Sequence, residues 1–324
     1  MTIKAIQMTE TGGPEVLIYR DVELGSPKPG EVQVRHSAIG INYIDTYHRS
    51  GLYPVPLPFT PGTEAAGQVV AVGEGVTQFK AGDRVAYALS AGAYAEAGNV
   101  PATALVALPD GVREEEAAAL MLKGMTTQYL FRQTYALQAG ETCLFHAAAG
   151  GVGLIACQWA KALGVTLIGT AGGAEKCALA RKAGAAHVID YNSEDVVARV
   201  MEITDGRKVP VVYDGVGKST FETSLDCLAP RGLLVSFGNA SGPVTGVNLG
   251  VLAAKGSLYV TRPTLATYTA TPEALRACAD DLFAQVASGA VKADIRQRFP
   301  LAEAAQAHRD LEARKTVGAT LLIP

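Results

Sequence analysis

The sequence predicts an α/β protein in which a β-rich part, with the pattern of a small barrel, is followed by a doubly wound parallel sheet. Three observations predict this fold class. Up to about residue 125, short strand-like runs are separated by glycine and proline, as in small barrels. From about residue 114, helix-forming runs alternate with apolar strand-like runs, the pattern of βαβ units. At 141–164 an apolar run, a glycine-rich turn and an amphipathic helix follow one another directly.

In the β-rich part, alternation of polar and apolar residues predicts strands at 4–8 and 31–35. Apolar runs bounded by glycine predict two more, at 67–72 and 85–88. Because all four are short and are separated by turns, we expect them to form a small barrel.

The second part begins with helices expected at 115–122 and 126–135. Parallel strands are then expected at 142–147, 165–170, 187–191, 209–213, 232–237 and 257–261. The helices expected between them are 154–163, 175–182, 194–203 and 219–228. A helix at 272–288 and strands at 295–299 and 320–323 are expected to return to the first domain. The predicted domains are therefore 1–125 with 264–324, and 126–263.

Composition excludes several classes of function. The net charge is −3 and no dense block of Lys and Arg occurs, so nucleic acid is not expected as the main ligand. No apolar run approaches the roughly 20 residues that span a bilayer. The five cysteines are widely spaced and form no C-x-x-C, which argues against disulfides and thiolate zinc sites. We therefore expect a reduced, cytoplasmic protein without a membrane segment.

The turn formed by Gly150, Gly151, Val152 and Gly153 is the first candidate binding site. Glycine lets a backbone approach phosphate closely, and the amides at the start of a helix face an anion. Ala148 stands where the dinucleotide fingerprint has its first glycine, so the match is imperfect. A plain strand-to-helix turn is the alternative, but the flanking strand and helix favour a pyrophosphate cradle.

The end of the second strand bears on the choice between NADPH and NADH. Sites that prefer NAD usually place a carboxylate about 20 residues after the glycine turn. Here the strand ends in 170–173, which contains no acidic residue, and Lys176 follows. Lys176 alone is equally compatible with a solvated lysine on a helix surface. Together, the missing acid and the lysine favour a 2′-phosphate and hence NADPH.

Several further segments resemble one family. They are Gly12–Leu17, Gly40–Tyr47, Arg49–Pro54, Pro61–Gly67, Leu122–Thr126, His146–Gly153 and Val235–Ala240. The sequence resembles the zinc-free quinone oxidoreductases related to zeta-crystallin, within the medium-chain dehydrogenase/reductase superfamily. The resemblance implies a GroES-like β-barrel catalytic domain, a Rossmann domain, a cleft between them and a homodimer joined through the sheet edges of the Rossmann domains.

The resemblance also bears on metal. Zinc-dependent members have a Cys in the loop occupied here by 40–42, and a His-Glu pair where this chain has Thr63 and Glu64. We therefore expect no metal and no alcohol oxidation. His146, beside the glycine turn, is interpreted as a packed or capping imidazole.

Candidate contacts near the nicotinamide follow from the resemblance. It places Asn42, Tyr43, Asp45, Thr46 and Tyr47 along the cleft. Asn42 is expected to hydrogen-bond a carbonyl oxygen, and Tyr47, with Tyr53, to provide flat walls and phenol donors. Asp45 and Glu64 suggest acid–base catalysis, but a salt bridge or helix cap is the favoured interpretation.

Other contacts implied by the resemblance lie in the second part of the chain. Thr126, as a catalytic candidate, and Thr127 are expected to begin a helix that faces the cofactor. Loop residues are expected to close over the nicotinamide: Gly238, Asn239 and Leu265. The expected neighbours of the 2′-phosphate, besides Lys176, are Tyr191 and Arg314. Gly172, at the end of the second strand, is also expected to bind the cofactor.

The leading hypothesis is an NADPH-dependent reductase of quinones, with ortho-quinones expected. Quinone carbonyls are already electrophilic, so positioning is the protein's main contribution. Reduction of the double bond of enones or 2-alkenals is a second hypothesis, which requires a proton donor to the α-carbon. A third, of another class, is an NADPH-binding regulatory or crystallin-like structural protein.

Overall fold

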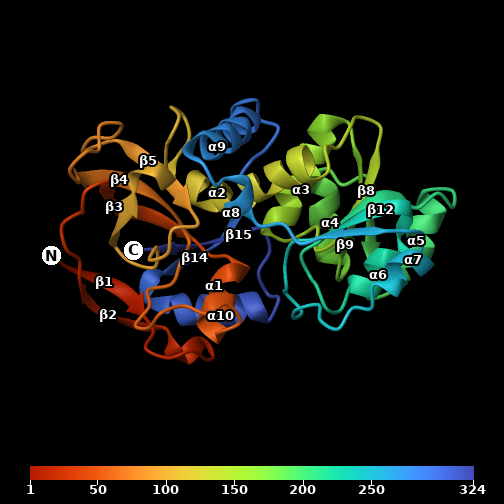
Figure 1. The fold of residues 1–324 in the computed structure, drawn as a ribbon, viewed down its shortest axis with the longest axis horizontal. Helices are drawn as coiled ribbons and strands as arrows, with labels where there is room; N and C mark the ends of the chain where they lie inside the picture. The colour runs from red at the N-terminus through yellow and green to blue at the C-terminus, as the bar shows by residue number, and fades with distance from the viewer. The chain divides into compact units, whose positions relative to one another are not determined.

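A computed structural model describes residues 1–324, which divide into two compact units. Unit 1 consists of Met1–Lys123, Thr271–Asp280 and Ala293–Pro324. Unit 2 consists of Gly124–Ala270 and Asp281–Lys292. Figure 1 labels the helices and strands of both. None of the helices combines the length and the apolarity that crossing a membrane requires.

Unit 2 contains a six-stranded sheet with the order β10-β9-β8-β11-β12-β13. Every neighbouring pair is parallel. From β8 the chain adds β9 and then β10 on one side. It then returns to pair β11 with the other side of β8 and adds β12 and β13 beyond it, so the direction reverses between β8 and β11. The strands are β8 Thr142–Phe145, β9 Thr166–Ala171, β10 His187–Asp190, β11 Val209–Asp214, β12 Leu228–Ser236 and β13 Tyr259–Thr261.

Helices connect these strands and cover the sheet (Figure 1). They are α3 Gly151–Leu163, α4 Ala174–Ala183, α5 Val196–Ile203, α6 Phe221–Asp226, α7 Gly250–Ala254 and α8 Leu265–Tyr268. Helix α3 packs beside α4, and α5 beside α6. Because parallel crossovers are right-handed, reversing the direction of winding moves the helices to the other face. Apolar residues of the strands, among them Leu144, Ile168 and Val212, each 0% exposed, form much of the core of this unit.

Unit 1 is built on strands that pair mostly antiparallel. One sheet has the order β14-β15-β3-β4-β5-β7, with β6 also paired to β3, and β1 pairs with β2 separately. The strands are β1 Thr2–Gln7, β2 Ile18–Glu23, β3 Glu31–Gly40, β4 Glu64–Val72, β5 Arg84–Ala88, β6 Ala97–Pro101, β7 Leu105–Ala107, β14 Ile295–Pro300 and β15 Ala319–Ile323. The C-terminal strands thus belong to unit 1, where β15 pairs with β3.

Two helices belong to unit 1 alone, and two others contribute residues to both units. The first two are α1 Tyr43–Ser50 and α10 Ala304–Glu312; the others are α2 Glu114–Tyr129 and α9 Pro272–Ala287. A π-helical turn, Leu130–Thr134, continues α2, and single 3₁₀ turns occupy Pro14–Val16, Ala102–Ala104 and Leu301–Glu303.

The predicted fold class, with its doubly wound parallel sheet, is confirmed, but the sequence reading missed some elements and misplaced a helix boundary. Residues 43–50 form α1, which was not among the expected helices. The two helices expected at 115–122 and 126–135 are one helix, because nothing interrupts the helical run between them. Strand β2 was not expected, since its burial does not alternate: five of its six residues are exposed and one is half-buried.

Candidate functional site

The glycine turn stands at the carboxyl end of β8, where the strand order of unit 2 reverses. Gly150 is the N-cap of α3, and no side chain caps this helix. The amides of the first helical turn, at 151–153, have no acceptor within the helix. A Cβ on Gly153 would lie 2.7 Å from Cα of Ala148, a distance that real Cβ atoms do not reach. Position 153 therefore requires glycine, and the turn stands at a reversal of strand order, the kind of place at which α/β sheets bind nucleotides.

The backbone before the turn is held by both neighbouring strands. The amide of His146 donates to Tyr213 O of β11 (3.0 Å), and the amide of Ala148 donates to Thr170 O of β9 (2.9 Å). Ala147, between them, has φ of 55°, a left-handed conformation that is unfavourable for a residue with a Cβ. The sheet thus fixes a strained turn in place.

His146 is buried in a polar network beside the same turn. Its Nδ1 lies 3.0 Å from Oγ1 of Thr170, and its Nε2 lies 3.1 Å from Oγ of Ser224. Ser224 in turn donates to Oδ2 of Asp214 at 2.7 Å. Burial lowers the pKa of His146, opposed by the charge of Asp214. The interpretation of His146 as a packed imidazole is confirmed, because both ring nitrogens have partners within the fold.

The tip of the second strand contains a carboxylate that sequence reasoning missed. Gly172 and Gly173 follow β9, and Lys176 lies in the first turn of α4. Oδ1 of Asp190, at the end of β10, accepts the amide hydrogen of Gly173 at 2.9 Å. A parallel sheet brings the ends of β9 and β10 together, so linear distance from the glycine turn gave no signal for this carboxylate. The phenol of Tyr191 covers Gly172, where a Cβ would lie 2.6 Å from Oη.

The loop after β12 is tied to the loop after β11. A Cβ on Gly238 would lie 2.9 Å from Cα of Gly215. The amide of Lys218 donates to Gly242 O at 3.0 Å. Asp214 anchors the first of these loops, because its Oδ1 accepts the amide hydrogens at 216 (2.8 Å) and 217 (3.0 Å). Gly238 and Asn239 therefore lie in a loop that is held by contacts with the loop after β11.

Three more predicted residues lie in unit 2. Thr126 and Thr127 are buried near the end of α2, so the expectation that they begin a helix is wrong. The helix starts twelve residues earlier because Glu114 opens an uninterrupted helix-forming run. Leu265 is the buried first residue of α8, and Oγ1 of Thr264 caps this short helix by accepting from the amide of Thr267.

The candidates in unit 1 are gathered on and around α1. Asn42 is its N-cap and Asp45 closes a capping box, with the Asn42 amide donating to Oδ2 of Asp45 at 2.9 Å. The rings of Tyr47 and Tyr53 meet edge to face at 5.2 Å between centroids. Tyr43 donates through its hydroxyl to Leu311 O at 3.2 Å. Asp45 thus acts as a helix cap, in agreement with the favoured interpretation.

Two other predicted residues of unit 1 stand apart from this aromatic group. Thr46 is buried, and its hydroxyl donates to Tyr43 O at 2.7 Å. Arg314 follows α10 with φ of 58°.

Glu64 forms a buried ion pair next to Asn42. Its Oε2 accepts from Nζ of Lys123 at 3.0 Å and from Nδ2 of Asn42 at 2.8 Å, and its Oε1 accepts from the amide of Leu122 at 2.6 Å. Nδ2 of Asn42 also lies 3.4 Å from Gly40 O. Both N–H groups of the Asn42 amide are therefore directed at protein acceptors, and Glu64 has the salt-bridge role expected of it.

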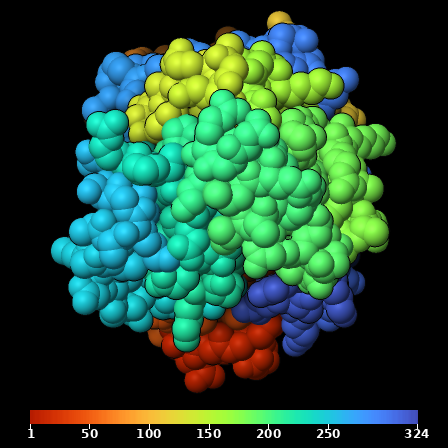
Figure 2. All heavy atoms as spheres, turned by 90° about the vertical axis from the view of Figure 1, so that its right-hand side faces the viewer, coloured from red at the N-terminus to blue at the C-terminus, as the bar shows by residue number.

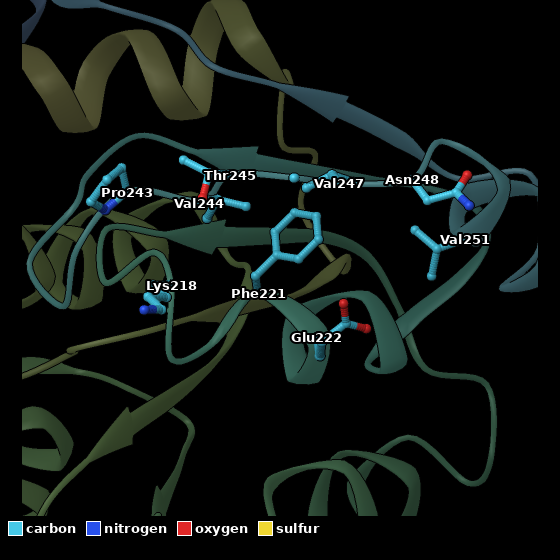
Figure 3. Close-up of a pocket in the computed structure, with 10 residues that line it drawn as sticks. Lys218, Phe221, Glu222, Pro243, Val244, Thr245, Val247, Asn248 and Val251 are labelled. Atoms are coloured by element: carbon cyan, nitrogen blue, oxygen red, sulfur yellow. The ribbon is translucent and has the colours of Figure 1, made fainter.

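A pocket of 290 Å³ lies elsewhere in unit 2 (Figure 3). Phe221 and Glu222 of α6 form one wall, and the segment 243–248 forms the opposite wall. None of the predicted site residues lines this pocket. The structure contains no group of three or more His, Cys, Asp or Glu side chains arranged to hold a metal ion.

Comparison with known proteins gives a family match for each of the two parts of the chain. Residues 28–110 match the family model of the alcohol dehydrogenase GroES-like domain, and 151–280 match that of the zinc-binding dehydrogenases. A quinone oxidoreductase of Pseudomonas aeruginosa is 64% identical over 99% of each chain. A 2-haloacrylate reductase from a Burkholderia species is 43% identical, again over 99% of each chain. The crystal structure of Escherichia coli quinone oxidoreductase complexed with NADPH superimposes with a TM-score of 0.96, at 56% identity, covering 99% of this chain and 100% of that one. The chain therefore belongs to the quinone oxidoreductase family of the medium-chain dehydrogenase/reductase superfamily, as its sequence motifs predict.

Proposed function

We propose that this protein is an NADPH-dependent quinone reductase. The observation that carries the proposal is the uncapped, glycine-lined start of α3 at the point where the strand order reverses, in a chain similar along its whole length to quinone oxidoreductases. NADPH, when bound, supplies the hydride. The protein's own contribution is to bind the nucleotide, to orient the acceptor and to exclude water.

The residues of unit 2 fit a nucleotide with a 2′-phosphate. The amides at 151–153 are oriented to receive the pyrophosphate. Lys176, in the first turn of α4, adds a positive charge near the glycine pair that follows β9. Asp190 places a carboxylate at this tip, and its Oδ1 already accepts from the amides of Gly173 and Asn192. We propose that Lys176 and Tyr191 contact the 2′-phosphate.

The residues of unit 1 fit an aromatic acceptor. Tyr47 and Tyr53 provide two rings at an edge-to-face angle of 67°, which suits a flat molecule lying against one of them. We propose Tyr47 and Tyr53 as walls of the quinone site, with phenol groups that can donate. Asn42 can donate to a quinone carbonyl only by exchanging its contact with Gly40 O.

The test is the loss of NADPH absorbance with a panel of ortho-quinones, para-quinones, enones and 2-alkenals, run in parallel with NADH. Turnover of quinones with NADPH supports the proposal. The similarity to a protein named 2-haloacrylate reductase favours a second candidate, reduction of an activated carbon–carbon double bond. Turnover confined to enones or 2-alkenals would establish that second candidate instead. Binding of NADPH without turnover of any acceptor would leave the regulatory or structural alternative.

We also propose a homodimer joined through the free edge of β13. Tyr259 and Val260 on this strand are 61% and 40% exposed, and Leu249, just before α7, is 75% exposed. A sheet edge with large exposed apolar side chains favours pairing with a second copy. Figure 2 shows the light-blue segment near residue 250 at the surface of unit 2. Sedimentation of the wild type and of Tyr259→Lys tests this: the wild type should be a dimer and the variant a monomer.

A cytoplasmic location is proposed on the strength of the cysteines. All five are buried and free, as expected for a reducing compartment.

A further inference from the structure

Helix α1 has two opposite faces with different chemistry. Successive residues of an α-helix are turned by about 100°, so residues two apart lie on opposite sides. Tyr43 and Tyr47 are four residues apart and share one face. Asp45 and Arg49, also four residues apart, share the opposite face. The tyrosine face contributes to the proposed quinone site, and the charged face is turned into unit 1, where Asp45 is 0% and Arg49 3% exposed.

The charged face is closed by two residues that are distant in sequence. Oη of Tyr94 lies 3.1 Å from Oδ2 of Asp45 and 2.9 Å from Nε2 of His308. Nη1 of Arg49 lies 3.2 Å from Nδ1 of His308. Tyr94 and His308 both have no exposed surface. We call these four residues, Asp45, Tyr94, His308 and Arg49, the α1 clamp.

The direction of each hydrogen bond in the clamp follows from chemistry. A guanidinium group only donates, so Nδ1 of His308 must accept from Arg49. The imidazole is neutral, because burial and the charge of Arg49 lower the pKa of His308 to about 3. Its proton is therefore on Nε2 and is donated to Oη of Tyr94. The hydroxyl proton of Tyr94 is then free to be donated to Asp45.

Both ends of the clamp are anchored. Arg49 makes a two-bond ion pair with Glu312 (2.7 and 3.0 Å), four residues after His308 on α10. Asp45 also accepts from Oγ1 of Thr63 at 3.1 Å and from the Asn42 amide. The other charged groups that act on it or on its Tyr94 partner are Lys123 of α2 and Glu64 of β4.

We propose that His308 and Tyr94 are positioning residues for the reaction, which hold the tyrosine face of α1 in the orientation that receives the acceptor. This inference rests on the proposed function, in that it takes Tyr47 as part of the acceptor site. Neither His308 nor Tyr94 touches the acceptor, and both act through Asp45 and Arg49.

The first experiment compares His308→Leu with His308→Gln. Leucine removes both hydrogen bonds, whereas the glutamine amide can donate to Tyr94 and accept from Arg49. We expect His308→Leu to lower kcat/KM for quinones by about tenfold or more, since small misplacements are costly, and His308→Gln to recover most of the loss. The binding of adenosine 2′,5′-bisphosphate, which lacks the nicotinamide half, should not change. The matched control is His187→Leu, an exposed histidine on β10, which should behave as the wild type.

The second experiment does not depend on turnover. In His308→Leu, amide hydrogens of α1 should exchange with deuterium faster than in the wild type, while those of α3 keep the wild-type rate. In Tyr94→Phe, Asp45 loses a donor to its carboxylate, so its carboxyl-carbon NMR titration should move to higher pH by about one unit. Tyr19→Phe, at an exposed position, is the control and should leave the titration in place.

Several results would overturn the inference: wild-type kcat/KM in His308→Leu, equal losses in the leucine and glutamine variants, or an unchanged exchange rate of α1 and an unchanged Asp45 titration. If the wild type turns over no quinone, the proposed function fails. The exchange and titration measurements would then still decide whether the clamp holds α1.

Discussion

Replacing Lys123 by methionine isolates the buried ion pair beneath Asn42. Lys123 and Glu64 expose 7% and 0% of their side chains and are 3.0 Å apart. Methionine keeps the length of the lysine stem, so packing changes little and the charge is lost. Glu64 keeps its bonds from Asn42 and the Leu122 amide, but it becomes a buried carboxylate without a counter-ion. Removal of one partner of such a pair costs about 3–5 kcal/mol, a large part of the stability of an ordinary protein.

The assay is urea unfolding, followed by circular dichroism. Two controls sharpen the result. Arg113→Met breaks an exposed pair with Glu116, whose side chains are 73% and 29% exposed, and should cost less than about 1 kcal/mol. The double variant Lys123→Met, Glu64→Gln should recover much of the loss, because the carboxylate is gone as well. Losses of equal size in Lys123→Met and Arg113→Met would refute the reasoning.

Three further outcomes are expected. Gly153→Ala should weaken NADPH binding roughly tenfold or more, because a Cβ would meet the backbone at Ala148; fluorescence titration measures this. The control is Gly25→Ala, which should bind NADPH normally, since a Cβ there meets nothing within 4 Å. Lys176→Gln should lower kcat/KM with NADPH by about tenfold, through loss of a charge-assisted contact, and leave kcat/KM with NADH unchanged; an equal fall with both would remove Lys176 from the 2′-phosphate site. Asp45→Asn tests linkage: burial, opposed by hydrogen bonds from Asn42, Tyr94 and Thr63 and by the charge of Lys123, raises the pKa of Asp45 to about 7. The folded state then binds more protons than the unfolded state, so the free energy of unfolding of the wild type should fall as pH rises from about 4 to 7. The fall should be roughly 4 kcal/mol relative to the variant. If urea unfolding gives the same pH dependence of this free energy for both proteins, the reasoning is contradicted.

The second part of the chain was the more predictable one. Its strands are buried on both faces and therefore read as continuous apolar runs, bounded by glycine turns. The motif at 150–153 was found from its glycines. Glycine is needed at 153 because a Cβ there would clash with the backbone. The start of α2 was predicted to within one residue, but its continuity was missed, because helices expected at 115–122 and 126–135 form one helix from Glu114 to Tyr129.

Helix α1 shows why the first part was harder to predict. It has eight residues, among them two tyrosines and a threonine, which are mediocre helix formers. Its capping pair, Asn42 and Asp45, lies in segment 40–47. That segment was used only as evidence of the family resemblance and was not used to predict a helix. What stabilises the helix is packing and the partners of Asp45 and Arg49, which lie up to 263 residues away along the chain.

The sequence by itself determined the fold class, the family and the pyrophosphate turn. It also determined the preference for NADPH, through the absence of an acidic residue at the end of the second strand. These features depend on local patterns, namely period, glycine positions and charge along a single element. Only the tertiary structure decided that Asp190 reaches the tip of β9, that Glu64 pairs with Lys123, and that Tyr94 and His308 close on α1. Such contacts join elements distant in sequence, and a buried polar group acquires its role from the partners that folding places around it.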